Sequence, residues 1–121
     1  MELVSFITTE GGDDLIVSFA VMGSADFTEI ENLMLLWTPK YDHLLPPEER
    51  GVSVSFERLS LDEDELVVEV RDSADEQTVW IATPRRTYEL DVRKVEKDEL
   101  AAMRRILGKM SRLGGLRYVR L

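Results

Sequence analysis

His43 is the residue best suited to acid–base chemistry near neutral pH, because it is the single histidine among the 121 residues. Tyr41 and Asp42 precede it in a stretch rich in proline. A catalytic serine would need a strained turn with His and a carboxylate converging on it, and the sequence has no Gly-x-Ser-x-Gly motif. We therefore interpret His43 as an exposed loop residue and predict no catalytic residues.

Acidic clusters are the next candidates, since carboxylates are the ligands that Ca²⁺ and Mg²⁺ prefer. No cluster has the alternating acids, central glycine and terminal glutamate of an EF-hand loop. The chain has no cysteine, and one histidine cannot supply a site that needs two imidazoles. We expect no metal and no cofactor, and interpret the clusters as solvated turns: Asp13 and Asp14, Asp62 to Glu65, and Asp72 to Glu76.

Charge is distributed unevenly along the chain. The 24 acids and 15 bases give a net charge of -9, which argues against nucleic acid as a partner, and the sequence has no Gly-rich phosphate loop. Residues 1 to 84 carry 19 acids and 4 bases, whereas residues 85 to 121 carry 5 acids and 11 bases. We interpret the C-terminal bases as a solvated helix face, with a functional basic strip as the alternative: Arg104, Arg105, Lys109, Arg112, Arg117 and Arg120.

Strands are expected to carry most of these side chains. Residues 3–9 and 15–22 flank Gly11-Gly12 and predict a hairpin. Residues 27–38 fit either a helical stripe or a strand buried on both faces, and we favour a strand over 29–38. The three prolines in residues 39–51 predict a surface loop, and alternating patterns predict further strands over 52–57, 65–71, 78–83 and 88–93.

One helix is expected near the C-terminal end. Leu100, Met103, Ile106, Leu107, Met110 and Leu113 recur at three- and four-residue spacing after Asp98, and Gly114-Gly115 ends the pattern. Residues 116–121 read as a short strand that returns to a sheet edge. The fold class is therefore α+β: a mainly antiparallel sheet of about six to seven strands, with one C-terminal helix packed on a face and a short final strand. We expect a single domain over residues 1–121.

A protein partner is the functional expectation. The chain has neither a basic leader nor a segment of roughly 20 apolar residues, so a cytoplasmic location without a membrane partner is predicted. In size, acidity and strand content it resembles the small cytoplasmic immunity proteins that bacteria pair with toxins, which implies a non-enzymatic module covering a basic site on a toxin or enzyme. The predicted partner-binding residues are Tyr41, Asp42, His43, Leu44, Leu45, Glu48, Glu49, Asp62, Glu63, Asp64, Asp72, Asp75 and Glu76.

Two other classes of function remain open at this stage. An edge strand such as 116–121, or the first hairpin, could pair with a second copy in a homodimer or other assembly. A small-ligand binder or an enzyme without a known motif would need a pocket with converging charged groups, and a filled core would exclude it.

Overall fold

A computed structural model describes residues 1–22, 30–57 and 65–121 and shows a mixed α+β fold, mostly sheet, with one long C-terminal helix. Every strand in these residues joins one nine-stranded sheet. The strands are β1 Glu2–Gly11, β2 Leu15–Met22, β3 Ile30–Trp37, β4 Ser53–Phe56, β5 Glu65–Leu66, β6 Glu69–Ser73, β7 Thr78–Ala82, β8 Thr87–Asp91 and β9 Arg117–Arg120. The helices are α1 Pro39–Asp42, the 3-10 helix η1 Pro47–Glu49, and α2 Lys97–Gly114.

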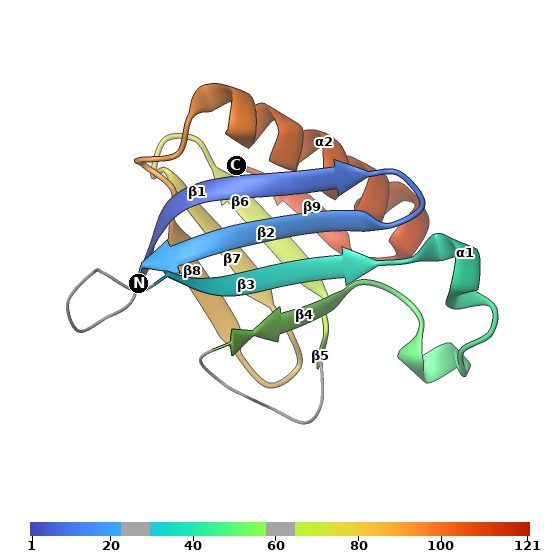
Figure 1. Cartoon of the computed structure of the whole chain (residues 1–121). Helices are drawn as coiled ribbons and strands as arrows, with labels where there is room; N and C mark the ends of the chain where they lie inside the picture. Colours follow the sequence, from blue (N-terminus) through green and yellow to red (C-terminus); the bar gives the residue numbers. More distant parts are fainter. Residues whose placement is uncertain (23–29, 58–64) are drawn as a thin grey trace.

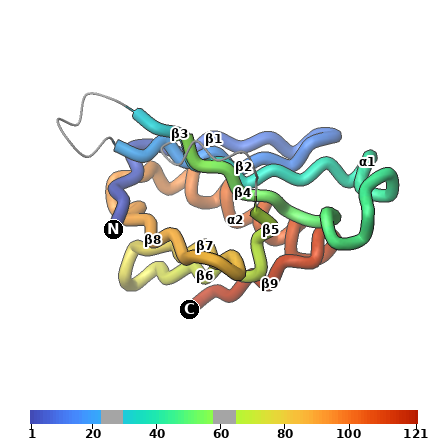
Figure 2. Tube along the Cα trace, turned by 90° about the horizontal axis from the view of Figure 1, so that it is seen from below, coloured from blue at the N-terminus to red at the C-terminus, as the bar shows by residue number. Residues whose placement is uncertain are grey.

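The sheet is folded over into two layers (Figure 1). Its strand order is β5-β4-β3-β2-β1-β8-β7-β6-β9, with β1–β8 and β6–β9 parallel and the other neighbours antiparallel. Seen from below, β1 to β4 form one layer and β6 to β9 the other, and α2 runs between them (Figure 2). The helix therefore closes the side on which the layers would otherwise leave their apolar faces open.

The two layers separate where β1 leaves β8. Only Glu2 and Leu3 of β1 pair with β8, and the register of β1 with β2 then shifts between Val4 and Phe6. This bulge turns both Val4 and Ile7 inward, three residues apart. Beyond β8, the Ile7 amide donates a 2.8 Å hydrogen bond to Glu99 Oε1 of α2. A helix side chain thus satisfies the β1 backbone where the neighbouring strand has diverged.

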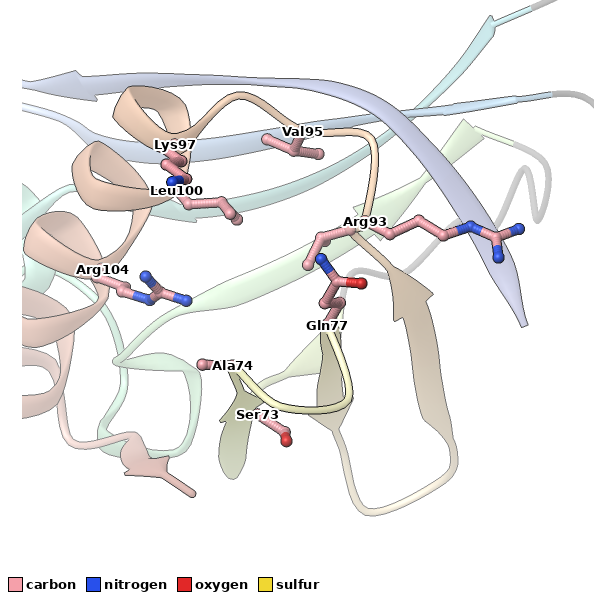
Figure 3. Close-up of a pocket in the computed structure, with 9 residues that line it drawn as sticks. Ser73, Ala74, Gln77, Arg93, Val95, Lys97, Leu100 and Arg104 are labelled. Carbon is pink, nitrogen blue, oxygen red and sulfur yellow. The ribbon is translucent and has the colours of Figure 1, made fainter.

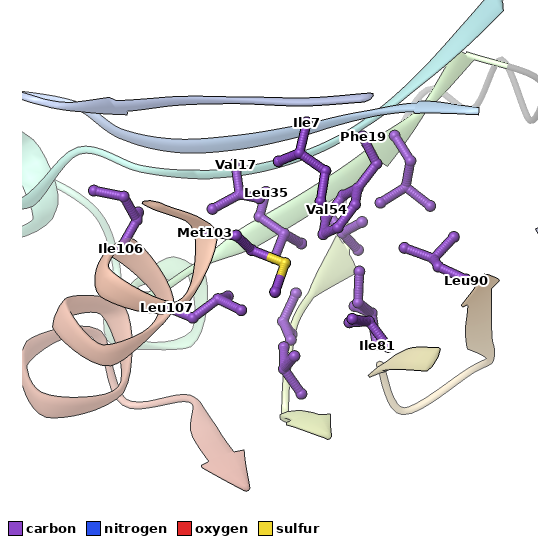
Figure 4. Close-up of a cluster of buried hydrophobic side chains, with 14 of the residues drawn as sticks. Ile7, Val17, Phe19, Leu35, Val54, Ile81, Leu90, Met103, Ile106 and Leu107 are labelled. Atoms are coloured by element: carbon purple, nitrogen blue, oxygen red, sulfur yellow. The ribbon is translucent and has the colours of Figure 1, made fainter. Parts of the chain in front are cut away.

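The core lies between the two layers and α2 (Figure 4). Val17, Phe19 and Leu35 from one layer meet Ile81 and Leu90 from the other, and all five are at most marginally exposed. The helix adds most of the stripe predicted from its spacing. Met103, Ile106, Leu107 and Met110 are buried and Leu100 is partly buried, whereas Leu113 is 70% exposed and lies outside the core. Burial of this three-sided core is the main stabilising term of the fold.

The chain passes from one layer to the other at residues 65–69. Val67 donates its amide to Val52 in the first layer, and Val68 donates to Ala82 in the second. At the same corner, Glu65 accepts a 2.6 Å hydrogen bond from Thr83 Oγ1. Arg86 Nε lies 3.1 Å from the other carboxylate oxygen of Glu65. These contacts tie β5 to the β7–β8 turn and hold the two layers together.

Three expectations about the fold need correction. The sheet has nine strands in the described residues, not six to seven, partly because the strand predicted over 65–71 is split into β5 and β6 where the chain changes layer. The sheet is mixed, because β1 and β9, at the two ends of the chain, pair in parallel with β8 and β6, which are far away in sequence. The predicted loop over 39–51 contains α1 and η1, each beginning at a proline, which fits the first turn of a helix.

Other elements follow the sequence pattern closely. Residues 30–37 form a strand, as preferred, rather than a helix, and residues 27–29 lie outside the described part. The final strand pairs with β6 at the end of the sheet. The long helix ends at Gly115, whose φ of 83° is the left-handed conformation that glycine adopts without a steric penalty.

Candidate functional site

The segment between β3 and β4, residues 38–51, is braced by its own side chains. Arg50 Nε donates to the Leu45 carbonyl at 2.9 Å, and Arg50 Nη2 donates to the His43 carbonyl at 3.3 Å. The Gly51 amide donates to Asp42 Oδ1 at 3.2 Å, and Gly51 has a φ of 121° that side-chain-bearing residues rarely adopt. The segment is therefore held in one arrangement although it projects from the end of the sheet (Figure 1).

This braced segment presents large apolar side chains to solvent. Tyr41 is 53% exposed, Leu44 69% and Leu45 41%. They line a groove of about 390 Å³ whose other wall includes Leu36 and the buried Trp37. Exposed apolar side chains that gather around a groove, with polar residues at its border, are a feature of binding surfaces.

The apolar surface continues onto the outer face of the sheet. Leu33, Leu35 and Trp37 of β3 are buried on the inner face, whereas Met34 and Leu36 point the other way and are half-buried. Ile16 of β2 lies directly opposite Leu36, and Figure 2 shows no described element over this side of β1 to β4. We call this apolar surface, which is half-buried on the sheet and exposed on the braced segment, the docking face: Ile16, Met34, Leu36, Tyr41, Leu44 and Leu45.

Acidic side chains border the docking face. Asp42, Glu48 and Glu49 belong to the braced segment, and exposed Glu10 of β1 lies opposite Ile16. The β1–β2 turn is tied to the same end, because Thr38 Oγ1 donates a 2.8 Å hydrogen bond to Asp14 Oδ1. An exposed base is also present: Lys40 Nζ lies 5.4 Å from the centre of the Tyr41 ring.

The predicted partner-binding residues do not all lie together. Tyr41 to Leu45, with Glu48 and Glu49, share the braced segment. Asp75 and Glu76 are exposed in the β6–β7 turn, at the opposite end of the molecule (Figure 1). Asp62, Glu63 and Asp64 lie outside the described residues. Sequence reasoning did not identify Ile16, Met34 and Leu36, although the continuous apolar run 33–37 was the signal that β3 carries two apolar faces.

Asp72 belongs to the interior rather than to a solvated turn. It is 2% exposed, and its Oδ2 accepts a 2.9 Å hydrogen bond from Arg104 Nε and a 2.8 Å hydrogen bond from the Tyr118 hydroxyl. These three residues come from β6, α2 and β9, so the cluster fastens the helix and the last strand to the sheet. Alternation was the overlooked signal, because Asp72 falls two residues after the fully buried Val70.

The cluster changes the electrostatics of its members. Its hydrogen bond to Asp72 raises the pKa of Arg104, which therefore stays charged. Burial, followed by the hydrogen bond to Asp72, raises the pKa of Tyr118 above its ordinary value. Arg104 is therefore not part of the solvated basic face predicted from the sequence, because its 26% exposed side chain is turned toward a buried carboxylate.

No metal site is evident in the described residues, which contain no group of three or more His, Asp or Glu side chains able to hold an ion. His43 is exposed, with its carbonyl accepting a hydrogen bond from Arg50. Among the helices of the described part, none is long and apolar enough to cross a membrane.

Comparison with known proteins adds no relative to this description. No protein-family model, curated protein or solved structure matches the chain.

Proposed function

We propose that this protein is a small acidic binding module whose docking face covers an apolar site, bordered by basic residues, on a partner protein. The observation that carries the proposal is the exposure of Tyr41, Leu44 and Leu45 on a segment that hydrogen bonds hold in place. Exposed apolar side chains on a preorganised backbone bind with little loss of conformational entropy. The central groove, with aromatic and aliphatic walls and an acidic rim, has the composition of a protein interface.

Charge favours a basic partner over a second copy of this chain. The net charge of -9 repels another copy at long range, and it attracts a basic surface and speeds its association. The edges of the sheet also offer little to an assembly: β5 has two residues, and β9 carries the exposed Arg117 and Arg120. An inhibitor or immunity-type role is the form of this function that fits a cover for an apolar site with a basic border.

The first experiment establishes that the docking face does the binding. The protein is immobilised and exposed to lysate of its source organism, and captured proteins are identified and purified. Replacing Tyr41 and Leu44 together by serine should raise the dissociation constant of the captured partner at least tenfold, as at interface hot spots, where each contributes about 1–4 kcal/mol. Capture that survives this double substitution contradicts the proposal.

The second experiment separates the two acidic ends of the molecule. Glu48→Lys with Glu49→Lys should slow association with the purified partner and weaken its dependence on salt. Asp75→Lys with Glu76→Lys changes the charge equally at the opposite end and serves as the matched control. Equal effects of the two pairs would show that only net charge matters, and a stable homodimer in mass measurements would identify a second copy as the occupant instead.

A further inference from the structure

A second cavity lies at the other end of the molecule, between the start of α2 and the β6–β7 turn (Figure 3). Its volume is about 390 Å³, within the range of small-molecule sites in proteins. Ala74 and Gln77 of the turn form one wall, and Val95, Lys97, Leu100 and Arg104 form the other. It shares no residue with the docking face.

The charged side chains that line this cavity are all basic. Its lining includes Lys97, Arg104 and Arg93 and contains no Asp or Glu, although the chain has 24 acids and 15 bases. Arg93 contributes least, because its Nε lies 3.2 Å from Asp91 and Figure 3 shows its side chain leading away from the cavity. Lys97 and Arg104 are therefore the two cations available to a ligand.

Arg104 is held in position from behind. Its Nε is bound to the buried Asp72, and the Tyr118 hydroxyl occupies the same carboxylate oxygen. The guanidinium reaches from α2 toward the turn that carries Ala74 and Gln77 (Figure 3). The guanidinium is planar, so with Nε bound to Asp72 its two terminal nitrogens remain as a fork whose geometry matches a carboxylate.

The remaining walls favour an apolar body over a fully hydrated ion. Val92 and Val95 are buried, and Leu100 packs partly buried against the same core. The turn is fixed to the opposite wall, because the Gln77 carbonyl accepts a hydrogen bond from the Val92 amide.

We propose that this cavity binds a small organic carboxylate, with the carboxylate at Arg104 and Lys97 and the apolar body against Val95 and Leu100. A monoanion suits two cations of which one already pairs with Asp72, and an apolar group of a few carbon atoms fits the volume. Nothing in this proposal depends on the docking face at the opposite end.

The test uses benzoate as the probe and backbone amide NMR shifts as the readout. We expect saturable shifts at Ala74, Gln77 and Val95 with benzoate. Acetate has the carboxylate without the aromatic ring, and benzyl alcohol has the ring without the charge, so both should bind at least tenfold more weakly than benzoate. Inorganic phosphate tests the anion class. Tighter binding of phosphate or acetate than of benzoate would overturn the assignment, as would benzoate shifts confined to other residues.

Variants connect the shifts to the two cations. Lys97→Gln, at an exposed position, should weaken benzoate about two- to fivefold, the range for one solvent-exposed charge. Asp72→Asn with Arg104→Gln removes the guanidinium without leaving a buried charge, and should weaken benzoate about tenfold or more. Arg105→Gln makes the same charge change on α2 outside the cavity and should leave affinity unchanged. Unchanged affinity in Lys97→Gln would by itself refute the proposal, even if the double variant failed to fold.

Discussion

Arg104→Met should be among the most damaging single substitutions on α2. The change keeps a side chain of similar length but leaves the 2% exposed Asp72 carboxylate with Tyr118 as its described side-chain partner. Removing one member of a buried ion pair costs roughly 3–5 kcal/mol. Because the Arg104 side chain is 26% exposed, we take the lower end, about 3 kcal/mol, or roughly two decades in the unfolding equilibrium constant.

A second substitution tests the cause of this loss. Asp72→Asn removes the buried charge and keeps an oxygen that accepts the Tyr118 hydroxyl, so Arg104→Met should cost only about 1 kcal/mol in that background. Urea unfolding at neutral pH measures each variant, with an unchanged slope required for comparison. Arg105→Met is the matched control. A loss of less than about 0.5 kcal/mol for Arg104→Met, or an equal loss with and without the Asp72 charge, would contradict the unpaired buried carboxylate as the cause.

Three further changes probe contacts at other places in the fold. The pKa of Tyr118 in the folded state is raised above its ordinary value of 10.0. The protonated hydroxyl therefore contributes a stabilisation that is complete below about pH 10 and is lost as the pH rises further. Tyr118→Phe should cost about 1 kcal/mol at pH 7 and reduce the loss of stability above about pH 10, which urea midpoints at pH 7 and above pH 10 would show. Glu99→Ala should cost about 1–2 kcal/mol and speed hydrogen exchange of the Ile7 amide, which donates a hydrogen bond to Glu99. Unchanged exchange at Ile7 would contradict that hydrogen bond. Gly114→Ala places a Cβ 3.2 Å from the Trp37 ring and should cost about 1–3 kcal/mol, while Gly12→Ala, in open space, should be near neutral in thermal unfolding.

Local pattern was sufficient for the elements whose neighbours in space are also neighbours in sequence. β2 has the predicted bounds, and the three- and four-residue spacing from Leu100 onward placed α2 correctly. Parallel pairing of β1 with β8 was not predictable, because nothing local to residues 2–3 specifies partners at 90–91. The change of layer at Val67 and Val68 was missed for a similar reason, since two alternating runs on different layers read as one strand.

The candidate sites show the same difference between residues that are neighbours in sequence and residues that meet only in the folded chain. The apolar and acidic residues of 41–49 share one segment of the structure because they are contiguous in sequence, and their partner-binding role stays a prediction. The sequence pattern predicts that Asp72 and Arg104 face solvent because each lies in a cluster of charges, although Asp72 shares the face of Val70. Their pairing spans 32 residues, and long-range pairs of this kind follow from the tertiary fold.

The position of α2 between the layers also has consequences for how the chain folds. Strands β1 to β4 can form from nearby hairpins, but their inner face, with Val17, Phe19 and Leu35, stays exposed until residues 97–114 arrive. Closure of the core further requires β8 to pair with β1 and β9 to pair with β6, and both pairings join strands that are far apart in sequence. The rate-limiting event should therefore be late and non-local, giving slow folding for a chain of this length. During that interval the unfinished first layer is the species most exposed to aggregation.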